Sequence, residues 1–313
     1  MQEYDYIVVG AGTAGCVLAA RLSADPGTRV LLLEAGGAAR TRAMTVPGAW
    51  PENLGSLADW AGVTTPQADA GPVPYPRGRG LGGSGAINAM AHIRGHRAVY
   101  DGWAADGAAG WAFADLLPYF RRSERADGRD PALRGTGGPV RVAPAADRHP
   151  VARAFAEALA GPGCPLTDDL SGRDQEGVAW PDLAISAGER VSPADAYLRP
   201  VLGRPNLVTE TGALATRLQV RGGRCAGVSY IRDGAAAEAV AGGEVILAAG
   251  AVGSPQLLLR SGIGPARSLR SLGVEVVADL PRVGRNTQDP PTVMVPHVRH
   301  SALYPSRDKH GGV

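Results

Sequence analysis

Three glycines, Gly10, Gly12 and Gly15, follow a short run of β-branched residues and precede a stretch of small residues. Glycines at this spacing let the backbone approach a pyrophosphate, and a helix that follows them points its free N–H groups and positive dipole end at the anion. Glu34 ends the next apolar run, where its carboxylate can accept hydrogen bonds from ribose hydroxyls and would repel a 2′-phosphate. The pattern therefore predicts a site for a dinucleotide, FAD or NAD rather than NADP.

Two buried strands and a helix must hold these glycines and the acid in place. The β-branched run at 7–9 is typical of a fully buried parallel strand, and the apolar run at 30–33 predicts its neighbour. Between them the small residues at 16–22 predict a helix that ends before Pro26. Strand, glycine turn, helix and strand in this order form a dinucleotide-binding crossover.

A second strand-to-helix unit lies far along the chain. Residues 244–250 are again apolar and end in small side chains. Ser254 and Pro255 are typical of a helix N-cap and a first helical position, and Gly262 is typical of a helix end. Because this unit repeats the character of the first, we expect it to return to the same parallel sheet. The nucleotide-binding domain is then discontinuous in sequence.

The most unusual stretch is the glycine-rich segment at 78–88. A flexible linker would have polar spacers between its glycines, yet Leu81, Ile87 and Met90 provide apolar anchors at both ends. We therefore expect a fixed loop whose backbone packs against a flat ligand.

The composition favours an ordinary globular protein of about two domains. The chain has 313 residues, a formal net charge of +2 and scattered basic side chains, so neither nucleic acid nor an anionic membrane is indicated as a partner. Its three cysteines are far apart in no metal-ligand spacing, which favours reduced thiols and no metal. We find no signal segment and no apolar run long enough to cross a bilayer, so the expected location is the cytoplasm.

Two segments resemble the signature motifs of a known family. Residues 78–101 and 250–264 look like the two motifs of the glucose–methanol–choline oxidoreductases, FAD enzymes that oxidise alcohols. The nearest resemblance is to bacterial choline-dehydrogenase-like members, and it extends over about 4–289. The first motif departs at one position, where His92 replaces the usual aromatic residue or alanine.

The resemblance implies FAD as the cofactor, with its adenosine ribose on Glu34 and its adenine against Ala215. Some members bond the flavin covalently through a histidine at the position that Ile87 holds here, so we expect the FAD to be noncovalent. The full set of expected cofactor contacts is Gly10, Gly12, Thr13, Ala14, Gly15, Glu34, Ser84, Asn88, Ala89, Met90, Ala91 and Ala215.

The resemblance also implies a ping-pong reaction. A small-molecule alcohol gives a hydride to the flavin, a base takes the hydroxyl proton, and oxygen or a quinone reoxidises the flavin. In the family the base is a histidine near the C-terminus of full-length members, and we expect this chain to be truncated before that segment. No catalytic residue is therefore assigned. A lone histidine is more often a structural group than a catalytic one, which applies to all six histidines of the chain: His92, His96, His149, His297, His300 and His310. His92 is the nearest of them in sequence to the glycine-rich segment at 78–88.

The predicted fold class is α/β, with an FAD-binding, Rossmann-like domain of three layers and an inserted, incomplete α+β substrate domain. Residues 1–110 and 191–289 are expected to form the FAD-binding domain, and residues 111–190 the insertion that covers the nucleotide or shapes the substrate cavity. Residues 290–313 should begin a strand of the substrate domain, at 292–298, and end in a tail. Smaller elements expected inside these ranges are helices at 111–122 and 151–159 and a β-hairpin that pairs 214–220 with 225–231.

Three functions remain open at this point. The first is an FAD-dependent alcohol dehydrogenase or oxidase of the family, and the second is a remnant that binds FAD without catalysis. The third is an NAD-dependent dehydrogenase, which explains the first 34 residues but leaves the segments at 78–101 and 250–264 unexplained.

Overall fold

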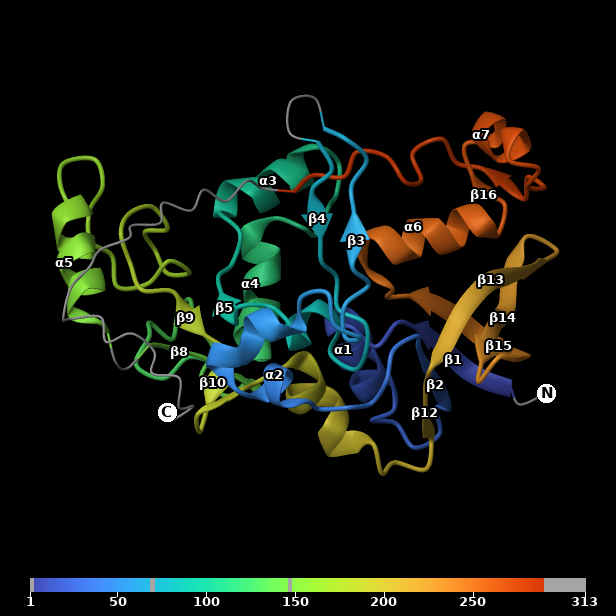
Figure 1. Cartoon of the computed structure of the whole chain (residues 1–313), viewed down its shortest axis with the longest axis horizontal. Coiled ribbons are helices and arrows are strands. Elements are labelled where there is room, and N and C mark those ends of the chain that lie inside the picture. The colour runs from blue at the N-terminus through green and yellow to red at the C-terminus, as the bar shows by residue number, and fades with distance from the viewer. Residues whose placement is uncertain (1–2, 68–70, 146–147, 290–313) are drawn as a thin grey trace.

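A computed structural model of the chain describes residues 3–67, 71–145 and 148–289. Figure 1 shows a large sheet with its helices at one end of the molecule and short strands and helices, among them α5 (Pro150–Leu159) and β8 (Ala143–Pro144), at the other end. The predicted strand at 292–298 and the whole range 290–313 lie outside the described residues. Within the described ranges, no helix is both long and apolar enough to span a membrane.

The predicted crossover is present at the start of the chain. Strand β1 (Glu3–Val9) leads through the glycine turn into helix α1 (Thr13–Leu22), and β2 (Val30–Glu34) pairs with β1 in parallel. The helix begins three residues earlier than the range 16–22 because Gly12 is its N-cap. Its end at Leu22 agrees with the prediction.

Both strands of the crossover are buried on both faces, as their continuous apolar runs predicted. Ile7 and Leu31 pack on one face of the sheet, against antiparallel strands at 213–247 and helix α6 (Gly250–Arg260), whereas Val8 packs on the other face, against Cys16 of α1. A turn of π-helix, η3 (Ala194–Leu198), joins α1 on that second face. The molecule thus has the three layers that the sequence predicted, and the α/β fold class is confirmed.

The largest sheet in the described part of the chain has the strand order β12-β2-β1-β15-β14-β13. Strand β12 (Leu207–Thr211), β2, β1 and the second half of β15 (Ala235–Leu247) are parallel. The first half of β15 pairs antiparallel with β14 (Arg224–Arg232), which pairs in turn with β13 (Ala213–Arg221). The predicted return of residues 244–250 to the parallel sheet and the predicted hairpin are both confirmed.

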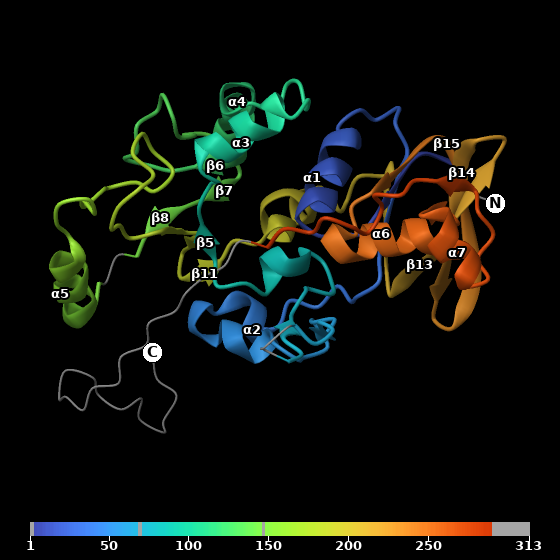
Figure 2. The same cartoon turned by 90° about the horizontal axis from the view of Figure 1, so that it is seen from above.

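Helix α6 (Gly250–Arg260) packs against β13, as Figure 2 shows. It begins four residues before Ser254, so the predicted start at Ser254 and Pro255 was wrong. Gly250 has φ of +81°, which lets the chain leave β15 and enter the helix almost at once. Pro255 therefore lies inside the helix, and Gly262 follows its end as predicted.

The chain between β2 and β12 forms many short elements. Helices α4 (Phe113–Ser123) and α5 (Pro150–Leu159) confirm the helices predicted at 111–122 and 151–159. The domain boundaries at 110, 190 and 289 stay predictions. The other elements are α2 (Arg42–Thr45), η1 (Pro47–Asn53), β3 (Gly62–Val63), β4 (Pro74–Tyr75), η2 (Gly83–Ala86), β5 (Ala91–His92), α3 (Arg97–Ala105), β6 (Glu124–Arg125), β7 (Val140–Arg141), β8 (Ala143–Pro144), β9 (Asp182–Leu183), β10 (Ile185–Ser186), β11 (Glu189–Arg190), η4 (Arg199–Val201), β16 (Ile263–Gly264), α7 (Ala266–Ser271) and β17 (Ala278–Asp279).

Candidate cofactor site

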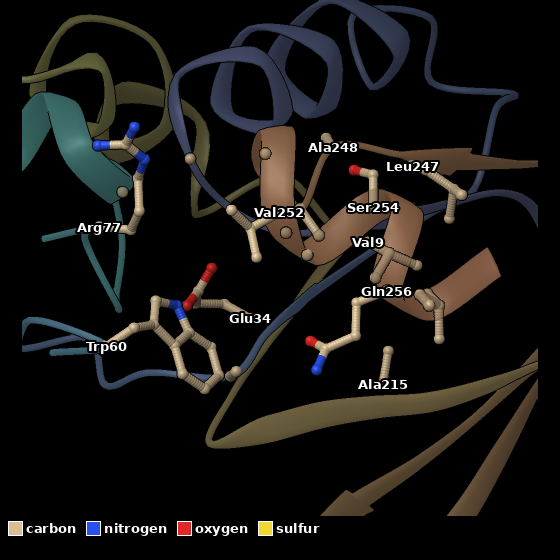
Figure 3. A pocket seen from close by; sticks show the side chains of 18 of the residues that line it. Val9, Glu34, Trp60, Arg77, Ala215, Leu247, Ala248, Val252, Ser254 and Gln256 are labelled. Atoms are coloured by element: carbon tan, nitrogen blue, oxygen red, sulfur yellow. The ribbon is translucent and has the colours of Figure 1, made fainter. Parts of the chain in front are cut away.

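A cavity of about 760 Å³ lies where the glycine turn, the glycine-rich loop and the start of α6 meet. Figure 3 shows Trp60 on one side of it, Val252 and Ser254 of α6 on the other, and Glu34 between them. Its size is in the range of cofactor sites, about 300–1,000 Å³. Seven of the predicted cofactor contacts line it: Gly10, Gly12, Thr13, Ala14, Glu34, Ser84 and Ala215.

The three glycines of the turn have different roles. A Cβ on Gly10, whose φ is +100°, would lie 2.6 Å from the carbonyl oxygen of Ala248, and one on Gly15 would clash with the carbonyl oxygen of Gly10. Gly15 thus serves helix–strand packing and does not line the cavity. Gly12 lines the cavity, and a Cβ there would come no closer than 3.9 Å to a protein atom. Protein packing does not require a glycine at Gly12, so the free space above it is suited to a ligand.

Glu34 ties three backbone segments together beside this cavity. Its Oε2 accepts a hydrogen bond from the amide of Ala11 at 2.8 Å, and its Oε1 accepts from Gly36 at 2.8 Å and from Gly80 at 3.0 Å. Burial raises the pKa of Glu34, and these amides act in the opposite direction. A carboxylate has about four acceptor positions, so one remains for a hydroxyl group. This arrangement fits the ribose contact that the resemblance implies.

The glycine-rich loop packs directly on the glycine turn. Gly83 has φ of +54°, and a Cβ on it would lie 2.7 Å from the Cα of Gly12. Beside it, the hydroxyl of Ser84 lines the cavity and accepts a hydrogen bond from the amide of Gly78 at 3.1 Å. The segment is therefore a fixed loop, as predicted, and lies against the crossover.

Two helix N-termini open onto the same cavity. Helix α1 starts at Thr13 and α6 at Gly250, and neither N-cap residue, Gly12 or Ala249, gives a side-chain hydrogen bond to the first turn. Free N–H groups and the helix dipole attract anions, so this pair is suited to the diphosphate of a dinucleotide. The glycine spacing predicted the first of these N-termini, whereas the second was not predicted, although the motif at 250–264 is the signal that could have pointed to it.

An aromatic and cationic wall on the far side of the cavity was also missed. Trp60 is half-exposed and lines the cavity together with Tyr75 and Arg77. The Arg77 guanidinium lies 3.7 Å from the centre of the Tyr75 ring, and that of Arg79 lies 5.1 Å from the Trp60 ring. The buried carboxylate of Asp59 holds this wall in place by accepting a hydrogen bond from the Arg77 amide at 2.9 Å. The one feature of the sequence that could have indicated this wall is the tryptophan Trp60 next to Asp59.

A second cavity, of about 250 Å³, adjoins the first at Thr13, which lines both. Three predicted contacts, Asn88, Met90 and Ala91, line this second cavity. Ala89 and Gly15 line neither cavity. The structure thus divides these predicted contacts between two cavities that meet at the start of α1, and the individual contacts stay predictions.

Each histidine in the described ranges makes a hydrogen-bond contact with a neighbouring carboxylate or backbone amide. His92 lines the second cavity, and its Nε2 lies 3.0 Å from Oε2 of the buried Glu124. His96 and His149 accept amide hydrogen bonds as the N-cap residues of α3 and α5. The candidates His297, His300 and His310 lie outside the described residues. The described ranges contain no group of three acids, cysteines or histidines arranged to hold a metal ion.

Comparison with known proteins identifies the family. The family model of the GMC oxidoreductases matches residues 4–292. Mitochondrial choline dehydrogenase of Mus musculus is 45% identical over 321 residues, which cover 97% of this chain and 54% of that protein. The chain thus spans about half the length of the curated relatives it matches.

Two solved structures share the fold over most of the chain. Pyridoxine 4-oxidase from Mesorbium loti has a TM-score of 0.83 at 38% identity and covers 89% of this chain and 55% of its own. An FAD-dependent oxidoreductase from Chaetomium thermophilum has a TM-score of 0.85 at 35% identity, covering 91% of this chain and 52% of its own. Because the family match spans nearly the whole sequence, the chain belongs to the GMC oxidoreductases, which confirms both the predicted family and FAD as the cofactor.

Proposed function

We propose that this chain is the FAD-binding part of an oxidoreductase that acts on the CH–OH group of a small alcohol. The main support is the convergence of Glu34, the Ser84 loop and the N-termini of α1 and α6 on one cavity. Bound there, FAD would accept a hydride from the alcohol carbon while the hydroxyl proton leaves to a base, so that the alcohol becomes a carbonyl compound. The mouse relative is a choline dehydrogenase, which makes choline the first alcohol to test.

The residues of this chain would hold the cofactor mainly through main-chain groups. Amides at Thr13 and in the first turn of α6 would bind the diphosphate, and Glu34 would accept a hydrogen bond from a ribose hydroxyl. Asn88 and its neighbours would flank the flavin from the second cavity. Ile87 is buried and carries no group that can bond to a flavin, which supports noncovalent binding.

The proposal includes three further points from the sequence. The electron acceptor is oxygen or a quinone, the location is the cytoplasm, and residues 111–190 cover the nucleotide or shape the substrate cavity. The catalytic base is not assigned to any described residue.

The cofactor part of the proposal is tested with Gly12→Ala. Gly12 has φ of −75°, which alanine adopts without strain, and the added methyl group meets no protein atom closer than 3.9 Å. We expect the unliganded variant to lose at most about 1 kcal/mol of stability, the cost of alanine in place of glycine at the N-cap of α1. Its FAD affinity should fall at least about tenfold, or about 1.4 kcal/mol, because the methyl group occupies ligand space. Equilibrium titration of both proteins with FAD, with NAD as a control ligand, measures this effect.

The catalytic part is tested by mixing the FAD-loaded chain anaerobically with choline and a panel of other small alcohols. Loss of the oxidised flavin absorbance with at least one alcohol is the expected result. A yellow protein that no alcohol bleaches would instead support the remnant that binds FAD without catalysis. A colourless protein stabilised by NAD and not by FAD would overturn the proposal.

A further inference from the structure

Arg190 is a buried arginine that has no carboxylate partner among the described residues. It is 2% exposed, and its Nε donates to the carbonyl oxygen of Met44 at 2.8 Å. Nη1 donates to Oδ1 of Asn88 at 2.8 Å and Nη2 to the carbonyl oxygen of Asn88 at 2.6 Å. These acceptors are neutral, whereas buried charges are usually paired with opposite charges. Burial lowers the pKa of Arg190, and the field of Asp195 offsets only part of that effect.

Asp195 does not supply the missing counter-charge, because two other arginines already share it. Its Oδ1 accepts hydrogen bonds from Nε of Arg40 at 3.2 Å and from Nε of Arg199 at 3.1 Å. Its Oδ2 accepts from the hydroxyl of Ser192 at 2.7 Å. Arg40 also pairs with Glu189 at 2.7 Å. Arg40, Arg190 and Arg199 thus face two carboxylates, Asp195 and Glu189, which leaves an excess of one positive charge.

This excess charge lies at the second cavity, which Arg190 lines together with Asn88 and Met90. Oδ1 of Asn88 accepts hydrogen bonds from Arg190 and, at 3.0 Å, from the amide of Met90. Two donors on Oδ1 fix the orientation of the side-chain amide and leave its Nδ2 to donate elsewhere. The same contacts hold Met90 at φ of +63°, a conformation that few residues other than glycine adopt. Arg190 thus places a positive charge next to the loop that contains Asn88 and Met90, and it also fixes the conformation of that loop.

We propose that Arg190 is a positioning residue that holds a positive charge beside the flavin and raises the reduction potential of the cofactor. The inference rests on the proposed function, because it requires that Asn88 and its neighbours flank the flavin. A hydride carries two electrons and one proton, so the ring that accepts it gains one negative charge, while the alcohol is oxidised and its hydroxyl proton goes to the base. The reduced cofactor then provides the counter-charge that the described residues do not.

Arg190→Gln in the full 313-residue chain loaded with FAD tests the inference. Glutamine keeps a side-chain donor for Asn88 and removes the charge. We expect the two-electron midpoint potential to fall by about 30 mV, which equals a tenfold change in equilibrium constant. Sulfite, which adds to oxidised flavins and leaves the ring anionic, should bind about tenfold more weakly. A purely structural arginine would alter the Tm and leave both of these quantities unchanged.

Arg204→Gln is the matched control for net charge. Nη1 of Arg204 also donates to neutral oxygens, the carbonyl of Ala20 at 2.7 Å and the hydroxyl of Ser23 at 2.9 Å, but Arg204 lines neither cavity. We expect its potential and sulfite affinity to match those of the unmodified chain. Equal shifts in Arg190→Gln and Arg204→Gln would overturn the inference.

Asn88→Asp provides a second test if Arg190→Gln does not fold. This variant keeps Arg190 and places a carboxylate at the position of Oδ1, 2.8 Å from Nη1, so that the guanidinium becomes paired. The potential and the sulfite affinity should fall in the same direction as in Arg190→Gln. A folded, FAD-loaded variant with both values unchanged would refute the role of Arg190 and leave the proposed function intact. A chain that binds no FAD would overturn both.

Discussion

Two buried arginines of this chain, Arg134 and Arg190, have opposite surroundings. Arg134 is 0% exposed and donates to the carboxylates of Glu124, Asp169 and Asp182. Arg190 donates only to neutral oxygens. Burial acts to lower the pKa of both, yet hydrogen bonds to Glu124 and Asp169 raise the pKa of Arg134 above its ordinary value, whereas that of Arg190 stays lowered. The fold balances charge in the insertion and leaves it unbalanced at the cofactor loop.

The balanced network gives the 111–190 segment an interior that its apolar residues do not supply. Among the described residues of this segment, the buried hydrophobic side chains are Phe113, Ala126 and Val142. Arg94 and Arg129 join the network through Glu124 and Asp182, which gives three arginines and three carboxylates. Removing one member of a buried network is far more damaging than removing an exposed ion pair, because the partners keep their charge without water.

Arg134→Met is expected to have the largest effect. Methionine fills much of the volume but leaves Glu124, Asp169 and Asp182 short of a partner, so the free energy of unfolding should fall by about 3–5 kcal/mol. Urea denaturation followed by circular dichroism measures it. Arg42→Gln, which breaks the exposed pair with Glu52, is the control and should cost at most about 1 kcal/mol.

If Arg134→Met and Arg42→Gln had the same small effect, the insertion would not depend on its buried charges. The difference between the balanced charge of Arg134 and the unbalanced charge of Arg190 would then have no consequence for stability.

Glu124→Gln should show a pH-dependent loss of stability. Burial alone would raise the pKa of Glu124, but hydrogen bonds from His92, Arg134 and the Gly135 amide hold it well below its ordinary value. A carboxyl group with a lowered pKa stabilises the fold above its unfolded pKa, about 4.3, and this stabilisation is lost as the pH falls towards the folded pKa. The variant should therefore be less stable by about 2–3 kcal/mol at neutral pH.

Urea denaturation over a series of pH values checks the sign. As the pH falls below about 4, the unfolded chain binds a proton at Glu124 while the folded chain does not, so the stabilisation is progressively lost and the curves of the unmodified chain and of Glu124→Gln should approach each other. A constant gap across the whole range would show that the ionised form of Glu124 does not stabilise the fold.

The cofactor region could be predicted from the sequence much better than the insertion, for a physical reason. The glycine turn and Glu34 belong to a local pattern in which each residue type has one backbone task, so their spacing carries the information. Arg134 and its partners are joined over separations of up to 48 residues, and any arginine could pair with any acid along that length. The pairing therefore depends on tertiary structure, which no local pattern reveals.

The start of α6 shows a different failure. Ser254 and Pro255 form a standard helix-start pattern, and that local preference was overridden because Gly250, with φ of +81°, turns the chain directly after β15. The missed residues Trp60 and Arg77 stand on short elements with no periodicity, and their place on the cavity wall depends on the turn that Asp59 holds.

Gly83→Ala tests the cofactor region, which is held together by contact between the backbones of Gly83 and Gly12 and not by buried ion pairs. The new methyl group would lie 2.7 Å from the Cα of Gly12, on a residue with φ of +54°. We expect an FAD affinity about tenfold lower, together with a loss of stability greater than the about 1–2 kcal/mol that the left-handed backbone alone costs, because Gly12 must shift. Gly222→Ala is the matched control, since Gly222 has φ of +57° and open space around its Cα. It should lose only the cost of the left-handed backbone and bind FAD normally.

His92→Phe should have the smallest effect. It changes a residue that touches both the buried charge network and the second cavity. His92 lines the second cavity, as Arg190 does, but its Nε2 lies 3.0 Å from Oε2 of Glu124, whose charge Arg94 and Arg134 already balance. Losing one of several hydrogen bonds to a satisfied carboxylate should cost about 1 kcal/mol. The sulfite affinity should change less than about threefold, because the charge beside the cavity is that of Arg190. A loss of sulfite affinity as large as that expected for Arg190→Gln would mean that the balanced network, and not the unpaired arginine, sets the potential at the cofactor.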